Sequence, residues 1–191
     1  MKKQDLWATP VWSIEIPSID PRIISQEVYE RQTEDPGGNK ASRSGGYNSS
    51  IIKSALAKPE TKKLIGLIEK LSIDVFGEFG FSHLPKVTGF WVNIFETNDY
   101  TEAHCHPGST MSAVYWSKVP ENSGDLLLHN RVENDFIQMT WGGWQDNKYN
   151  TTRIKFPAQA GTLVIFPSWL THSVERNLSS EDRISLGFNL S

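Results

Sequence analysis

Apolar residues recur at every second position through most of residues 87–190, and this period constrains the fold more than any other feature of the chain. Successive side chains of a strand point to opposite faces, so short alternating runs predict β-strands. Turn signals containing Gly, Pro, Asn or Asp separate the runs. We predict strands at residues 87–95, 109–119, 124–129, 153–156, 161–166 and 183–190, and another within residues 6–16. At least seven short strands of this spacing indicate a mainly β (α+β) fold, arranged as a sandwich, jelly roll or barrel.

A helix is predicted near the N-terminus, before the strands. Pro21 is a favourable first helical residue and Asp20 before it is a favourable cap, so the helix should run from there to about Arg31. Residues 34–50, which follow, are rich in Gly, Ser, Asn and charged side chains. This composition predicts a long surface loop.

A second helix is predicted from Pro59 to about Phe76, where apolar residues recur at spacings of three and four. A chain of 191 residues is long enough for one domain with a substantial core. We therefore expect a single domain over residues 1–191. Residues 1–80 would supply the first strand, the helices and the loop, with the helices packed on the sheet, and residues 81–191 would form the β core.

Charge and cysteine content limit the partners and the compartment. A net charge of −3 and a pI of about 6.0 give no electrostatic reason to expect duplex nucleic acid or an anionic membrane as a partner. Cys105 is the one cysteine, so no disulfide framework is expected. No apolar run approaches the roughly 20 residues of a membrane span. These features predict a cytoplasmic protein, or one of the host cytoplasm if a phage encodes it. A homo-oligomer is possible through the edge strand near Trp12.

The segment Y-T-E-A-H-C-H-P at residues 100–107 carries two imidazoles, His104 and His106, two positions apart. On a strand, side chains with this spacing share a face, so both could point into one cavity. His172 lies just beyond the predicted strand 161–166, where a jelly roll could return it to the same cavity. Three imidazoles would suit a divalent first-row metal and leave positions open for water, substrate or oxygen, as a catalytic metal site requires.

Arg183 and Ser185 begin the last predicted strand and share a face of it. A guanidinium beside a hydroxyl can bind a carboxylate, with two parallel hydrogen bonds from the arginine. A pocket with a metal at one end and this pair at the other would accommodate a small dicarboxylate.

Together, His104-Cys-His106, His172 in F-P-S-W-L-T-H-S-V and Arg183-Ile-Ser185 resemble the 2-oxoglutarate- and iron(II)-dependent oxygenases, most closely a small group from phages and marine bacteria. The resemblance covers roughly residues 87–190. It implies a double-stranded β-helix (a jelly roll, cupin-like) and an oxidoreductase that uses Fe(II), 2-oxoglutarate and O2. The substrate would be an unidentified small molecule or side chain, oxidised while 2-oxoglutarate is converted to succinate.

Carried onto this sequence, the resemblance implies that His104, His106 and His172 ligate the iron. Arg183 would bind the distal carboxylate of 2-oxoglutarate, assisted by Ser185. Strand parity then suggests four further residues that face the cosubstrate: Asn93, Ser112, Trp116 and Leu128.

One departure from the larger superfamily concerns the metal ligands. The superfamily binds iron with two histidines and one carboxylate, whereas His106 stands at the carboxylate position here. Either the site contains three histidines, which we favour, or a carboxylate such as Asp125 or Glu102 completes it.

Two other classes of function remain open at this level. A cupin-like three-histidine dioxygenase or isomerase would keep the histidines but would not use 2-oxoglutarate, leaving Arg183 without a role. A non-enzymatic jelly-roll module that binds carbohydrate or belongs to a phage particle would make the histidines incidental.

The tryptophans are candidates for the substrate pocket, although aromatic residues in β folds are more often part of the core. Those considered are Trp91, Trp116, Trp141, Trp144 and Trp169. The segment at residues 141–149, within the 141–150 loop, has the composition of a flexible loop and could close over a substrate.

Overall fold

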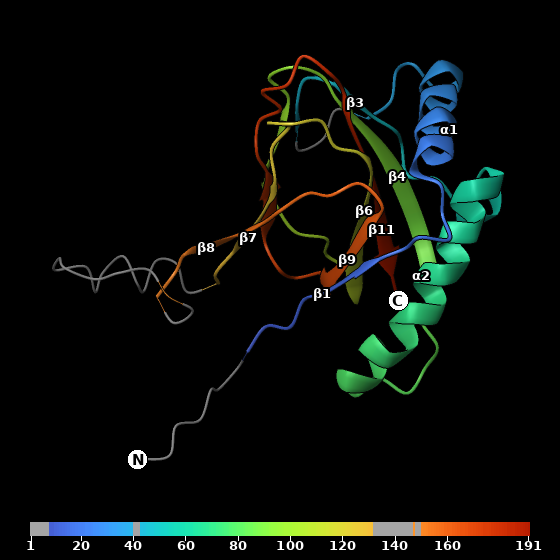
Figure 1. Cartoon of the computed structure of the whole chain (residues 1–191). Helices are drawn as coiled ribbons and strands as arrows, with labels where there is room; N and C mark the ends of the chain where they lie inside the picture. Colours follow the sequence, from blue (N-terminus) through green and yellow to red (C-terminus); the bar gives the residue numbers. More distant parts are fainter. Residues whose placement is uncertain (1–7, 40–42, 132–146, 148–149) are drawn as a thin grey trace, which may run out of the picture.

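A computed structural model describes residues 8–39, 43–131, 147 and 150–191, and within them the chain forms two antiparallel sheets and two α-helices (Figure 1). The first sheet has the order β1-β9-β6-β11-β4-β3. Its strands are β1 (Trp12–Glu15), β9 (Thr162–Pro167), β6 (Met111–Lys118), β11 (Arg183–Leu190), β4 (Val87–Phe95) and β3 (Tyr47–Asn48).

The second sheet has the order β2-β5-β10-β7-β8. Its strands are β2 (Arg43–Ser44), β5 (Tyr100–His104), β10 (His172–Val174), β7 (Leu126–His129) and β8 (Arg153–Phe156). The helices are α1 (Pro21–Glu34) and α2 (Pro59–Glu78), with a short 3-10 helix, η1 (Ser54–Leu56), between them. The predicted mainly β architecture is therefore confirmed.

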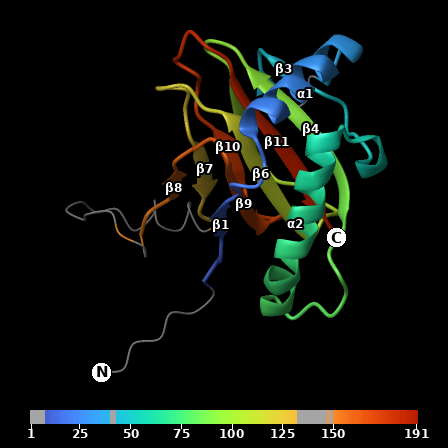
Figure 2. The same ribbon diagram turned by 45° about the vertical axis from the view of Figure 1, so that its right-hand side comes forward.

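The helices cover the outer face of the first sheet, while the second sheet faces its inner side (Figures 1 and 2). Alternation along β11 explains this layering. Ile184, Leu186 and Phe188 are fully buried in the larger core, which also contains Leu64 of α2 and Ile24 of α1. Burial of such side chains stabilises the helix–sheet contact by about 1.5–3 kcal/mol each.

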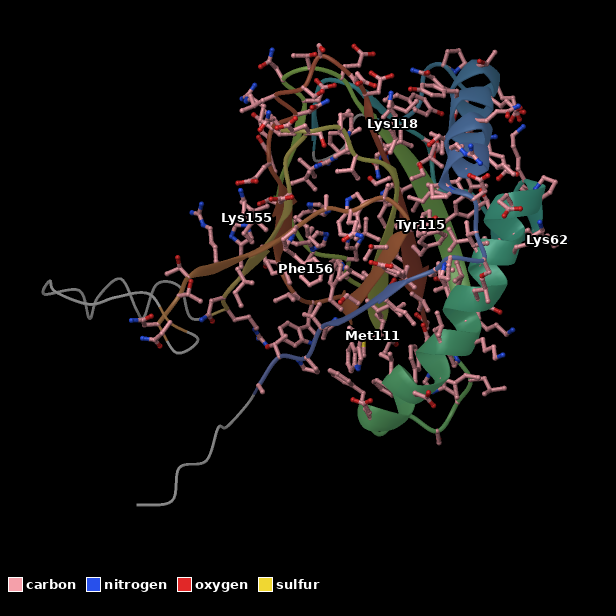
Figure 3. All side chains as sticks on the ribbon, in the orientation of Figure 1. Lys62, Met111, Tyr115, Lys118, Lys155 and Phe156 are labelled. Carbon is pink, nitrogen blue, oxygen red and sulfur yellow. The ribbon has the colours of Figure 1, made fainter. Side chains whose placement is uncertain are left out.

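A smaller apolar cluster lies between the two sheets, and it contains Trp116 of β6, Leu128 of β7 and Phe166 of β9. Figure 3 shows the side chains throughout the interior, with Lys62 of α2 and Lys155 of β8 on opposite outer sides of the molecule. The first sheet thus has two packed faces. One face builds the core with the helices, and the other is available for a site.

Each helix begins where the sequence predicts. Asp20 accepts a hydrogen bond from the backbone N–H of Arg22 (2.9 Å) and caps α1, which continues to Glu34, beyond the predicted end at Arg31. Lys58, before α2, makes no side-chain cap. Neither helix of the described residues combines the length and the apolar character needed to cross a membrane.

The prediction of a long surface loop at residues 34–50 is wrong in its second half. The strands β2 and β3 lie there, with Gly45 and Gly46 between them in left-handed backbone conformations. β2 pairs with β5 and β3 pairs with β4, so this short segment adds an edge strand to each sheet. Two-residue strands are formed by backbone pairing and leave no periodic pattern of side chains.

Candidate metal centre

A cavity of about 270 Å³ lies between the two sheets, and residues from both sheets line it. The alternate positions of β11 that face away from the helices supply Ser185, Gly187 and Asn189. Trp91 and Asn93 line the cavity from the neighbouring strand β4. The strands that build the core therefore present a polar row to the cavity.

The three predicted metal ligands lie together at this cavity. Their nearest ring nitrogens are all within 4.8 Å of one another, in a cluster formed by His104, His106 and His172. His172 begins β10 and pairs directly with His104 at the end of β5. His106 lies beyond the end of β5, so the expectation that one strand carries both histidines is wrong. A backbone hydrogen bond from His106 N to Ser168 O (2.9 Å) holds that residue beside the others.

Backbone carbonyls fix the ring orientation of two of the histidines. His104 Nδ1 is 2.8 Å from the carbonyl oxygen of Glu102, and His172 Nδ1 is 2.9 Å from that of Leu170. A carbonyl can only accept, so each Nδ1 carries the proton and donates it. Each Nε2 is then left with the lone pair that a metal binds, as is usual for histidine ligands. His106 Nε2 lies 3.2 Å from His172 Nε2.

Burial keeps two of the imidazoles neutral. Burial, together with the nearby charge of His104, lowers the pKa of His172 to about 3 and that of His106 to about 4. Neutral nitrogens are the form in which histidine binds metal. Three imidazoles on one cavity fit a divalent first-row ion.

The two carboxylates considered as a possible metal ligand lie outside the histidine cluster. Asp125 accepts a hydrogen bond from the backbone N–H of Ala158 (2.9 Å) and pairs with Lys155. Glu102 is exposed, and its backbone oxygen holds His104. Among the described residues, the cluster that could hold a metal at this cavity contains three histidines and no carboxylate.

The residues predicted to face the cosubstrate occupy two environments. Asn93, Ser112 and Ser185 line the cavity. Trp116 and Leu128 lie in the apolar cluster between the sheets instead. Asn93 Nδ2 lies 3.4 Å from Ser185 Oγ, so the two polar side chains are neighbours on adjacent strands.

Arg183 is buried beside the cavity, with 1% of its surface exposed. Its guanidinium lies 4.3 Å from the ring centre of Phe95, which lines the cavity, and Nη1 donates to the carbonyl oxygens of Ser123 and Gly124. Nε is buried without a hydrogen-bond partner, and no carboxylate of the described residues lies within ion-pair distance. Burial lowers the pKa of Arg183 to about 10, so the group is charged at neutral pH.

The tryptophans considered for the pocket differ in position. Trp91 lines the cavity, whereas Trp169 is 42% exposed with Arg131 over its ring at 4.9 Å. Trp141, Trp144 and the possible lid lie outside the described residues.

Three polar cavity residues that lie just before β2 or between β2 and η1 were not predicted from the sequence. They are Asn39, Asn48 and Ser49. Their only signal was the polar composition that also predicted a loop. Cys105, between His104 and His106 in the sequence, also lines the cavity.

Solved structures similar to this chain share one fold. A prolyl-4-hydroxylase from Pseudomonas putida aligns with a TM-score of 0.67 and 16% identity, covering 97% of this chain and 94% of its own. The carbocyclase SnoK of nogalamycin biosynthesis, described as non-heme and α-ketoglutarate-dependent, aligns with a TM-score of 0.68 and 14% identity, covering 95% and 79%. HygX from Streptomyces hygroscopicus, solved with nickel and 2-oxoglutarate, aligns with a TM-score of 0.62 and 13% identity, covering 96% and 83%.

The two sheets and the gathered histidines define a double-stranded β-helix with a candidate metal centre, as predicted. No curated protein matches the chain in sequence. The family model described as "Putative 2OG-Fe(II) oxygenase" matches residues 89–189, more than half of the chain. The chain therefore belongs to this family, whose members are oxidoreductases that use Fe(II), 2-oxoglutarate and O2. Membership favours the oxygenase interpretation over a cupin-like enzyme without 2-oxoglutarate and over a binding module.

Proposed function

We propose that His104, His106 and His172 hold the Fe(II) of this oxygenase, and that Arg183 and Ser185 bind the distal carboxylate of 2-oxoglutarate. The observation that carries the proposal is the buried guanidinium beside the three-histidine cavity. Its Nε has no hydrogen-bond partner, and no carboxylate of the described residues lies within ion-pair distance, although the more distant Asp125 and Glu175 interact with its charge. A buried charge without a partner costs several kcal/mol. A carboxylate bound next to Arg183 would offset this cost.

The protein residues then have distinct roles. The three imidazoles supply neutral donors on one side, which leaves the remaining metal positions facing the cavity. Asn93 lies beside Ser185 and can orient its hydroxyl. When bound, the Fe(II) supplies the oxidative chemistry in which O2 converts 2-oxoglutarate to succinate and CO2 and oxidises the substrate.

The cavity also limits the substrate. Its described lining contains amide, hydroxyl, imidazole, thiol and apolar groups, and no Asp, Glu, Lys or Arg. An uncharged group of a small molecule or a side chain therefore fits this lining better than a charged one, because a buried charge needs a partner. The similar structures described as a prolyl-4-hydroxylase and a carbocyclase are consistent with either kind of substrate.

Calorimetric titration of the Mn(II)-loaded protein tests the carboxylate assignment under anaerobic conditions. The two ligands are 2-oxoglutarate and 2-oxopentanoate, which has a methyl group in place of the distal carboxylate. The wild type should bind 2-oxoglutarate at least about 10-fold more tightly, because a charged hydrogen bond contributes about 1.5–3 kcal/mol. Arg183→Leu should lose this preference, and Arg183→Lys should keep part of it.

Arg22→Leu is the matched control, since the side chain of Arg22 is 91% exposed and outside the cavity. Equal affinity of the wild type for the two ligands would overturn the assignment, even if Arg183→Leu did not fold.

A further inference from the structure

We propose that Trp91, held against Gly187, is a positioning residue that sets the orientation of His106. The inference rests on the proposed function, in which His106 is a metal ligand. It concerns how the third imidazole is held, since the structure holds the three rings in two different ways.

The three histidines differ in what holds their rings. His104 and His172 each donate from Nδ1 to a backbone carbonyl. His106 lies outside a strand, and its Nδ1 has no hydrogen-bond partner among the residues that the structure describes. Metal-binding histidines usually depend on a partner at the second nitrogen for their orientation. His106 therefore needs another source of restraint.

Trp91 provides a restraint through stacking. Its indole lies against the imidazole of His106, with ring centres 5.1 Å apart and ring planes inclined by 24°. His106 in turn stacks on His172, at 5.0 Å and 16°. The three rings form one continuous stack that starts at the cavity wall and ends at a ligand already fixed by Leu170. Offset stacking of aromatic rings is favourable beyond burial and restricts the tilt of each ring.

Gly187 makes the position of Trp91 possible. The two residues are direct cross-strand partners on β11 and β4. A Cβ atom added to Gly187 would lie 2.3 Å from Cε2 and from Cζ2 of the indole, far inside van der Waals contact. Glycine in the interior of a strand weakens the strand, and close approach of another group is a common reason for its presence. Any larger residue at position 187 would push the indole from its place against His106.

Cobalt(II) titration of the metal-free protein, followed by visible absorption, tests the proposal without using activity. The variants are Trp91→Leu, which removes the aromatic ring, Trp91→Phe, which keeps one, and Gly187→Ala, which keeps Trp91 but displaces it. Trp91→Leu and Gly187→Ala should weaken cobalt binding about 10-fold or more, as loss of a partner behind a metal ligand does. Both should also change the cobalt spectrum, and Trp91→Phe should restore most of the affinity.

Two control variants separate positioning from general damage. Trp12→Leu removes a tryptophan that packs on Phe79, and Gly66→Ala adds a Cβ where no atom lies within 4 Å. Both should bind cobalt as the wild type does. Circular dichroism shows whether each variant is folded. If Gly187→Ala is not folded, Trp91→Leu alone tests the positioning role.

Wild-type affinity and spectrum in folded Trp91→Leu would overturn the positioning role. Failure of the metal assignment gives a different result, because His172→Ala would then bind cobalt as tightly as the wild type. The two proposals can therefore fail separately.

Discussion

The imidazole of His172 is buried and that of His106 is partly buried, and both are neutral, which links the stability of the metal-free protein to pH. Their pKa values in the folded state, about 3 and about 4, lie below the ordinary value of 6.5. As the pH falls below 6.5, the unfolded chain takes up protons on these residues while the folded chain does not. Their contribution to stability is therefore complete above pH 6.5 and decreases as the pH falls toward 4 and 3.

We expect the free energy of unfolding of the metal-free protein to decrease between pH 6.5 and 5, by at most about 1.4 kcal/mol per pH unit for each histidine. Carboxylates such as Asp20, whose pKa is lowered by its hydrogen bonds with Arg22, act mainly below this window. Urea denaturation at several pH values measures the slope. His172→Asn should reduce this slope, and an unchanged slope in that variant would contradict a neutral, buried His172.

At the level of single residues, the sequence predicted which side chains belong to the site better than it predicted what surrounds each of them. The three histidines gather at one cavity, although His106 lies beyond the strand on which the parity argument relied. Parity also indicated that Trp116 shares a face with Ser112, but it could not show that an apolar cluster encloses the tryptophan while the serine reaches the cavity. How deeply a side chain is buried depends on how the two sheets pack together, and the sequence of one strand does not determine this.

Among the secondary-structure elements, α2 depends on a cap supplied by another helix. Glu27 of α1 is buried, and its carboxylate accepts hydrogen bonds from the backbone N–H groups of Glu60 and Thr61 (2.7 and 2.8 Å) and from Thr61 Oγ1 (2.7 Å). This carboxylate satisfies donors that Lys58, the residue at the cap position, leaves open. It also interacts favourably with the helix dipole.

Glu27→Ala should lower the free energy of unfolding by about 1–3 kcal/mol, because buried N–H groups would lose their acceptor. Urea denaturation measures the change. Glu30→Ala is the control, since Glu30 is exposed and its ion pair with Lys58 is screened by solvent. A similar loss in both variants would refute the capping role.

Secondary-structure elements could be predicted where their side chains form a regular pattern. β4 has the bounds that were predicted, residues 87–95, because its apolar alternation is long. β2, β3 and β10 were not predicted, since they contain two or three residues and depend on backbone pairing with distant strands. The position of His106 beyond β5 was missed for a related reason: β5 ends at His104, opposite the first residue of its partner β10.

On the scale of the whole molecule, β11 and β4 connect the core to the site. One face of each strand is buried against the helices, and the other lines the cavity with Ser185, Gly187, Asn93 and Trp91. Sites carried on strands are held more firmly than sites on loops. The fold therefore fixes the cosubstrate side of the proposed centre, while His106 relies on local contacts.

In the proposed function, one cavity binds the metal through the histidines and then 2-oxoglutarate through the metal and Arg183. Anaerobic thermal unfolding tests it most directly, with Mn(II) added first and 2-oxoglutarate second. Ligands that bind only the folded state raise the melting temperature. We predict a rise with Mn(II) and a second rise with 2-oxoglutarate that requires the metal. His172→Ala should lose both rises, and Arg183→Leu should lose only the second. Equal stabilisation of the wild type and His172→Ala by Mn(II) would contradict the claim.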